Sequence, residues 1–269
     1  MRICNNVTRF ILSGLCYTAA AALVAAAQPG APIRPEKTIV LFDGTSLDAF
    51  YTYLEHSKYE DPKGVFTIRD GLLRISGEEW GGITTKKAYR DYRLVVEWKW
   101  GGKTYPPRED RARDSGILVH GVGPDGAASN KWLESIEYQI IEGGTGDFIL
   151  VAGEGRPSLT VEVREGPHGQ LYWQEGGRRV RRDRGRFNWF GRDPEWKDVL
   201  GFRGRQDVER PAGEWNVSEV VCDGGTITAI VNGVVVNQGF DAEPSAGKIQ
   251  IQSEGAEILI RRIELRPVR

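Results

Sequence analysis

The amino-acid sequence predicts an all-β protein built as an antiparallel double sheet. Three observations support this: short alternating apolar and polar segments follow one another along the chain, turn sequences separate them, and no long stretch has helical periodicity. A length of 269 residues suits one large β domain, and 34 glycines suit a fold with many tight turns.

The first predicted element is a hairpin, because residues 65–69 and 72–76 both have strand character and flank Asp70-Gly71. The next is a strand from Tyr92 to Trp100, in which Leu94, Val96, Trp98 and Trp100 share one face. Further strands are expected at 116–120, 135–141, 148–151, 159–163, 217–222, 227–231, 234–237, 248–252 and 257–265.

The strand pattern fails between Arg164 and Pro211, so this segment is expected to be a long irregular insertion. It contains a basic run, Arg178 to Arg182, which in a nearly neutral protein favours a solvated or salt-bridged surface over a nucleic-acid site. Trp189, Trp196 and Phe190 either lie against a ligand or pack the insertion onto the sandwich; the sequence leaves both open.

The N-terminus has the pattern of a secretory signal. Arg2 and Arg9 precede an apolar run, and Ala25-Ala26-Ala27 ends it with small residues. We expect residues 1–27 to be a removed signal peptide, 28–37 a linker and 38–269 the folded domain, in a periplasmic or secreted protein. A membrane anchor is the alternative, but the run is short and prolines follow it.

Cysteine and charge fit an exported protein that stays in solution. Removal of the signal leaves Cys222 as the only cysteine, which excludes an intramolecular disulfide. The formal net charge of −1 provides no general attraction for nucleic acid or for an anionic membrane. We therefore expect neither nucleic acid nor, after signal removal, a membrane as a partner.

A candidate site follows from polar residues on strand faces. Core-facing Ile136, Tyr138 and Ile140 place Glu137 and Gln139 on the opposite face. The same alternation places Glu97 and Lys99 opposite the apolar residues of their strand, and chain order brings Asp114, Ser115 and His120 near them. If these strands share one sheet, its outward face carries a polar cluster suited to sugar hydroxyls; an ordinary solvated face is the alternative.

Trp80 lies in a glycine-rich loop, where its indole could stack on a pyranose. A divalent metal is conceivable at His120 and Glu137, although the spacing is not specific for one. The sequence contains no Gly-x-Ser-x-Gly nucleophile, and no cofactor is certain.

Several segments resemble the 3-keto-disaccharide hydrolase family, formerly a domain family of unknown function. They are 41–47 (LFDGTSL), 80–85, 91–94 with Glu97-Trp98, 114–117, 137–140, 213–216, Asn232-Gly233, 247–249 and 261–263. The chain departs from the family pattern at Asp114, where Asn is usual, and at Ser253-Glu254, near which a His is common.

The resemblance implies a jelly-roll sandwich similar to concanavalin A-like lectins and glucanases. It also implies removal of the acidic C2 proton of a 3-keto-glycoside and expulsion of the group at C1. On this basis His120 or Glu137 would be the base, and Lys99 or a metal would stabilise the oxyanion. Glu97 or Asp114 would orient groups or act as the acid, while Trp80, Gln139, Ser115 and Trp189 would bind the carbohydrate.

Two other functions remain open. The same fold serves non-catalytic carbohydrate-binding modules, so a lectin-like module is the main alternative. A conventional glucanase with paired carboxylates is less favoured, because its Glu-x-Asp-x-x-Glu spacing is absent.

Overall fold

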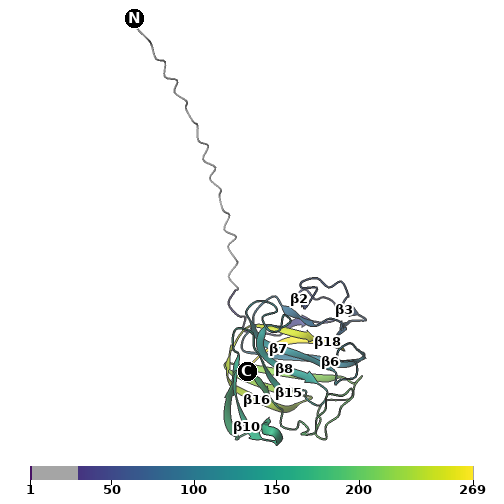
Figure 1. Cartoon of the computed structure of the whole chain (residues 1–269), viewed down its shortest axis with the longest axis vertical. Helices are drawn as coiled ribbons and strands as arrows, with labels where there is room; N and C mark the ends of the chain where they lie inside the picture. The colour runs from purple at the N-terminus through teal and green to yellow at the C-terminus, as the bar shows by residue number, and fades with distance from the viewer. Residues whose placement is uncertain (2–29, 269) are drawn as a thin grey trace.

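The computed structural model describes Met1 and residues 30–268, and these form two antiparallel β-sheets packed face to face (Figure 1). The predicted all-β jelly-roll sandwich is thereby confirmed. The predicted signal peptide lies almost wholly outside the described residues. Within them, no helix has the length and apolar composition needed to cross a bilayer.

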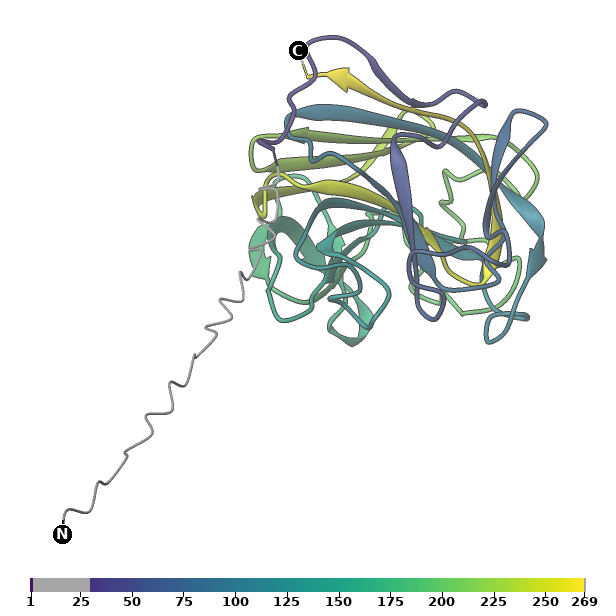
Figure 2. The same cartoon turned by 90° about the horizontal axis from the view of Figure 1, so that it is seen from above.

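The larger sheet has eleven strands. Its main path runs β11 (Leu171–Trp173), β10 (Ser158–Glu165), β16 (Val234–Glu243), β15 (Thr226–Val231), β14 (Asn216–Asp223), β6 (Tyr92–Thr104), β18 (Ala256–Pro267), β4 (Leu72–Ile75) and β3 (Phe66–Arg69). In addition, β1 (Ile39–Phe42) pairs with β18 and β12 (Arg178–Arg182) pairs with β10. Figure 2 shows the N-terminal strand beside the C-terminal one.

The smaller sheet has seven strands. Their order is β13 (Gly185–Phe187), β9 (Phe148–Val151), β8 (Glu134–Ile141), β7 (Asp114–Val122), β17 (Lys248–Ser253), β5 (Gly81–Thr85) and β2 (Phe50–Leu54). A short 3₁₀ turn, η1 (Pro167–Gly169), follows β10.

The predicted hairpin at Asp70-Gly71 joins β3 and β4. Both turn residues have positive φ, 51° and 72°, as a two-residue turn between strands requires. Local sequence was sufficient here because the turn geometry demands residues that tolerate the left-handed region.

The insertion is more regular than predicted. Between Arg164 and Pro211 it contributes β11 and β12 to the larger sheet and β13 to the smaller one. The basic run forms β12, where Arg179 pairs with Glu162 and Arg181 with Glu243. These ion pairs fit the predicted salt-bridged surface.

A serine hydroxyl connects the two sheets in the centre of the core. Ser218 on β14 accepts a hydrogen bond from the Trp98 indole nitrogen of β6 at 2.8 Å, and the Tyr138 hydroxyl of β8 lies 2.8 Å from the same oxygen. Trp98 and Tyr138 therefore point toward each other from opposite sheets. Since side chains alternate along a strand, the residues beside them point away from the core in opposite directions.

Candidate active site

The expectation that Glu97 and Glu137 share one sheet is wrong. Glu97 lies on β6 of the larger sheet and Glu137 on β8 of the smaller one. Each directly precedes one of the two aromatic residues that meet at Ser218, so the two carboxyl groups lie on opposite outer faces of the sandwich.

The outward face of the larger sheet is a partly exposed ion-pair surface. Glu97 pairs with Arg261 and Arg262, and the Lys99 ammonium lies 4.9 Å from the centre of the Trp215 ring. The structure therefore does not bring Glu97 or Lys99 to the predicted site. Which strands share a sheet is decided by pairing between segments far apart in the sequence. The alternation of side chains within one strand gives no information about that pairing.

Three of the predicted residues do come together on the outward face of the smaller sheet. On the adjacent strands β7 and β8, Gly116 pairs with Gln139 and Leu118 with Glu137. The Gln139 amide nitrogen donates a short hydrogen bond to the carboxylate of Asp114. Asp114, Glu137 and Gln139 thus form a continuous polar patch.

Gly116 allows two side chains to close over the middle of this patch. A Cβ built at Gly116 would lie 2.3 Å from an oxygen of Glu137 and 2.3 Å from an oxygen of Gln252 on β17. The missing side chain therefore makes the close approach of Glu137 and Gln252 possible. The Gln252 side-chain oxygen is buried without a hydrogen-bond partner in the described structure.

Loops cover this outward face. Arg108, from the loop between β6 and β7, places its guanidinium 3.2 Å from the Asp114 carboxylate. On the other side, Trp132 and Ala128 pack with Leu118, and the Leu133 backbone nitrogen donates to Gln250 at 3.1 Å. Glu137 is consequently only 4% exposed and Asp114 only 6%.

Burial makes the carboxyl groups hard to ionise. Loss of hydration, and next the negative charge of Asp114, raise the pKa of Glu137 to about 8. Burial also raises the pKa of Asp114 to about 7, although the Arg108 charge opposes the rise. Glu137 forms no salt bridge within the described residues, and the charge of Arg186 only partly offsets the rise in its pKa.

A third carboxyl group, Glu254, belongs to the same cluster. Burial raises its pKa well above the usual value, and the charges of Asp114 and Glu137 add to the rise. Arg108 and Lys131 oppose it. We call Asp114, Glu137 and Glu254 the carboxyl cluster; since like charges at short range cannot all ionise, it retains protons near neutral pH and can both accept and donate them.

His120 and Ser115 are not part of this cluster. A bulge follows Val119, and His120 there has a φ of 57°, which turns its ring onto Tyr92 in the core. Its Nδ1 lies 3.0 Å from the Pro244 carbonyl oxygen. Burial lowers the pKa of His120 to about 4, so the ring is neutral near pH 7.

Ser115 faces inward, where its hydroxyl donates to the Gln252 carbonyl at 3.0 Å. The predicted metal pair is not brought together either, because His120 faces the core and Glu137 faces outward. Among the described residues, no group of three or more His, Cys, Asp or Glu side chains is arranged to hold a metal ion.

Sequence reasoning missed Arg108, Glu254 and Lys131. Glu254 had a signal: Ile249 and Ile251 face the core, so Gln250, Gln252 and Glu254 continue on the outward side. Arg108 and Lys131 lie in loops, where no periodicity indicates direction.

Trp80 lies in a pocket of about 340 Å³ that also includes Lys131. Its ring stacks on Trp132 with centroids 6.5 Å apart, and the Lys131 ammonium lies 5.2 Å from its centre. The indole nitrogen is buried without a partner in the described structure. Trp189, in contrast, is 1% exposed and packs the insertion onto the core of the sandwich.

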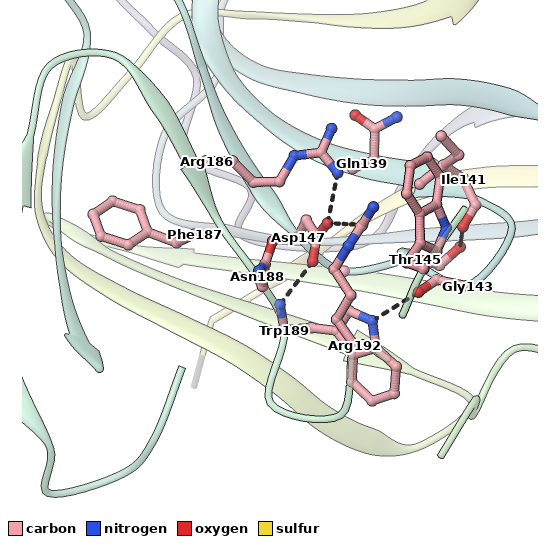
Figure 3. A network of polar contacts seen from close by, with 12 residues as sticks. Gln139, Ile141, Gly143, Thr145, Asp147, Arg186, Phe187, Asn188, Trp189 and Arg192 are labelled. Carbon is pink, nitrogen blue, oxygen red and sulfur yellow. Dashed lines mark hydrogen bonds and ion pairs between the residues drawn. The ribbon is translucent and has the colours of Figure 1, made fainter. Parts of the chain in front are cut away.

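A second pocket, of about 400 Å³, lies on the insertion and includes Arg186. The charge of Arg186 lowers the pKa values of both Asp114 and Glu137, which places this pocket electrostatically close to the carboxyl cluster. Figure 3 shows Arg186 and Gln139 on the same side of the network around Asp147.

The two-sheet jelly roll defines the fold class, and folds of this kind host both enzymes and binding modules, so the fold by itself does not fix the function. Residues 37–266 match the family of 3-keto-alpha-glucoside-1,2-lyase-like domains, and the chain belongs to this family. The resemblance found in the sequence is thereby confirmed. A search of curated proteins gave no match.

Solved structures with a similar fold include a presumed glycosyl hydrolase from Parabacteroides distasonis. It is 16% identical, with a TM-score of 0.50, over 87% of this chain and 95% of that one. A second such protein from the same organism is 19% identical, with a TM-score of 0.48, over 86% and 100%. A carbohydrate-binding module of family 66 from Bacillus subtilis is 10% identical, with a TM-score of 0.43, over 80% and 94%. At 16% identity, the first of these similarities shows the fold alone.

Proposed function

We propose that this protein cleaves 3-keto-glycosides by removing the proton at C2 and expelling the group at C1. The observation that carries the proposal is Glu137, a buried carboxyl group that forms no salt bridge with any described residue and whose pKa is raised to about 8. Such a group exchanges protons near neutral pH, which is what acid–base catalysis needs. Family membership supplies the carbohydrate class.

The reaction begins because a ketone at C3 makes the neighbouring C2 proton acidic. The base takes this proton, and the electrons of the C2–H bond form an enolate with the oxygen at C3. The enolate then reforms the ketone and a C1–C2 double bond, while the C1–O bond breaks with its electrons going to the leaving oxygen. An acid protonates that oxygen, and later addition of water to the double bond completes a net hydrolysis.

Glu137 and Glu254 are our candidates for base and acid. Glu137 raises the pKa of Glu254, and Glu254 is partly exposed, so it can exchange protons with solvent. An ionised member of the pair removes the C2 proton. A protonated member donates its own proton to the leaving oxygen. Arg108 offers positive charge for the enolate oxygen.

The test compares a 3-keto-glucoside bearing a chromogenic leaving group with its unoxidised parent, with and without divalent metals and chelator. We expect release from the keto compound alone. Glu137→Gln should lower the rate by about 10²- to 10⁴-fold. Glu97→Gln is the matched control on the other face and should retain the wild-type rate.

Full activity of Glu137→Gln on a substrate that the wild type cleaves would reject the assignment of Glu137. The near-complete cover over the cluster favours a second candidate, a non-catalytic carbohydrate-binding module. Sugar binding without release from either compound, weakened by Trp80→Ala, would support that function instead.

We also propose export through the N-terminal segment, to the periplasm or the outside of a bacterial cell. The support is the apolar run with Arg2 and Arg9 before it and small residues after it. N-terminal sequencing of the protein from a fractionated bacterial host tests this. A mature chain that begins near Gln28 in the exported fraction is expected, and an uncleaved cytoplasmic chain would contradict it.

A further inference from the structure

The pocket on the insertion is dominated by arginine, and we call it the arginine pocket. Its lining includes Arg182, Arg186 and Arg192, together with the polar side chains His168, Gln170 and Asn188. Three guanidinium groups in one pocket exceed what the family chemistry described above requires. They call for a negatively charged partner.

Two of the arginines, Arg186 and Arg192, share one carboxylate, Asp147, in the turn between β8 and β9. Arg186 donates to its Oδ2 at 2.8 Å, and Arg192 makes a short contact with the same atom (Figure 3). Arg182 forms no ion pair within the part of the chain that the structure describes; one of its nitrogens donates to the Arg186 carbonyl. Positive charge in the pocket is therefore in excess.

Asp193 also borders the pocket, but its carboxylate is engaged elsewhere. It accepts hydrogen bonds from the backbone nitrogens of Glu195 and Arg205 and lies 3.8 Å from the Arg205 side chain. It therefore does not balance the three guanidinium groups. Burial, and the repulsion from Arg186, lower the pKa of Arg192, as expected where positive charges gather.

Packing fixes the guanidinium groups before any ligand arrives. Arg192 lies over the Trp196 ring at 4.4 Å, and Arg182 over the Phe187 ring at 5.5 Å. Asp147 itself is held by the Trp189 backbone nitrogen at 2.7 Å. Planar guanidinium forks that are already oriented bind carboxylates and sulfates through paired hydrogen bonds, with little ordering cost.

The size and lining of the pocket indicate a sugar rather than a bare ion. A volume of about 400 Å³ exceeds the need of a single small anion. The amides of Gln170 and Asn188 and the imidazole of His168 suit hydroxyl groups. Arg186 lies beside Gln139 (Figure 3), whose amide donates to Asp114, so a sugar in this pocket would lie next to the carboxyl cluster.

We infer that the arginine pocket binds a sugar ring that carries an oxyanion, either a carboxylate or a sulfate ester. The inference rests on the carbohydrate-active class of the protein but not on the 3-keto mechanism. It assigns the insertion a role in selecting acidic glycosides.

The test is isothermal titration calorimetry of the full protein with methyl glucuronide, a glucose sulfate, methyl glucoside and inorganic sulfate. We expect binding of at least one charged sugar, weaker binding at higher salt, and no comparable binding of methyl glucoside. Arg182→Gln should weaken binding roughly tenfold. Arg184→Gln is the control, because that neighbour is exposed and lies outside the pocket.

The glucuronide and sulfate arms show which oxyanion is preferred. Three results would overturn the inference: equal binding of neutral and charged sugars, inorganic sulfate binding as tightly as the charged sugars, or unchanged binding by Arg182→Gln. The assay involves no turnover, so its failure leaves the proposed cleavage untouched. Failure of the cleavage test likewise leaves this binding result standing.

Discussion

The two outward faces of the sandwich carry similar residues in different states. On the larger sheet, Glu97 pairs with arginines at a partly open surface. On the smaller sheet, Glu137 lies under loops, has a raised pKa, and forms no salt bridge to the residues that the structure describes. Both glutamates alternate with core-facing residues along their strands in the same way. Their different environments come from the loops that cover the smaller sheet. A carboxyl group thus acquires acid–base character when its hydration is removed and no cation in direct contact replaces it.

The largest expected effect concerns buried charge. Asp147→Ala leaves Arg186 and Arg192 without their shared carboxylate, so we expect a loss of about 3–5 kcal/mol in the free energy of unfolding. Urea denaturation measures it. A loss under about 1 kcal/mol would mean that water replaces the carboxylate and that the network is less buried than described.

A smaller loss is expected from Gly116→Ala, because the added methyl group meets Glu137 and Gln252 oxygens at 2.3 Å. We expect about 1–3 kcal/mol of destabilisation together with lower cleavage activity. Gly102→Ala on the larger sheet is the control, since nothing lies within 4 Å of a Cβ there. Equal stability of the two variants in urea would contradict the close packing over Gly116.

The pH dependence of stability should also separate the two faces. The folded pKa of Glu137 is raised to about 8, so its proton stabilises the fold fully below the usual pKa of 4.5, and this contribution is lost as pH rises toward 8. Glu137 alone should lower the free energy of unfolding by up to about 1.4 kcal/mol per pH unit in this window, and the raised pKa values of Asp114, Glu254 and Glu209 add to the fall.

Glu137→Gln should make this slope shallower by the share of Glu137, because an amide has no proton to lose. Glu97→Gln should leave the slope unchanged. Urea midpoints measured between about pH 5 and pH 8 test both variants. Identical slopes for the wild type and Glu137→Gln would show that Glu137 is ionised in the folded protein.

The smallest effect is expected on the larger sheet itself. Glu97→Gln removes a partly exposed ion pair with Arg261, and such pairs contribute under about 1 kcal/mol. Thermal unfolding at low and high salt measures it, with the difference shrinking at high salt. A loss several times larger would mean that this face also holds charge away from water.

The local sequence pattern correctly predicted those features that depend only on residues adjacent in the sequence. Alternation correctly placed Tyr138 and Trp98 in the core, and Asp70-Gly71 correctly marked a turn. It also placed Glu137 and Gln139 on the outward face, where the structure has them. These outcomes follow from the two-residue period of a strand and need no knowledge of its partners.

What sequence could not predict depends on long-range contacts. Whether β6 and β8 share a sheet is decided by pairing, and His120 escaped alternation because a bulge reversed its direction. Arg108 reaches Asp114 from a loop whose path no periodicity describes. The raised pKa of Glu137 is a property of that cover, so it too appears only in three dimensions.

The attachment of the insertion through Asp147 constrains how such a chain can change in evolution. The aspartate belongs to the sandwich, while its partners Arg186, Arg192 and the Trp189 nitrogen belong to the insertion. Deleting the segment alone would leave an uncompensated charge in the remaining domain. We therefore expect shortened relatives to carry an uncharged residue at this turn, so that acquisition of the segment and of the aspartate went together.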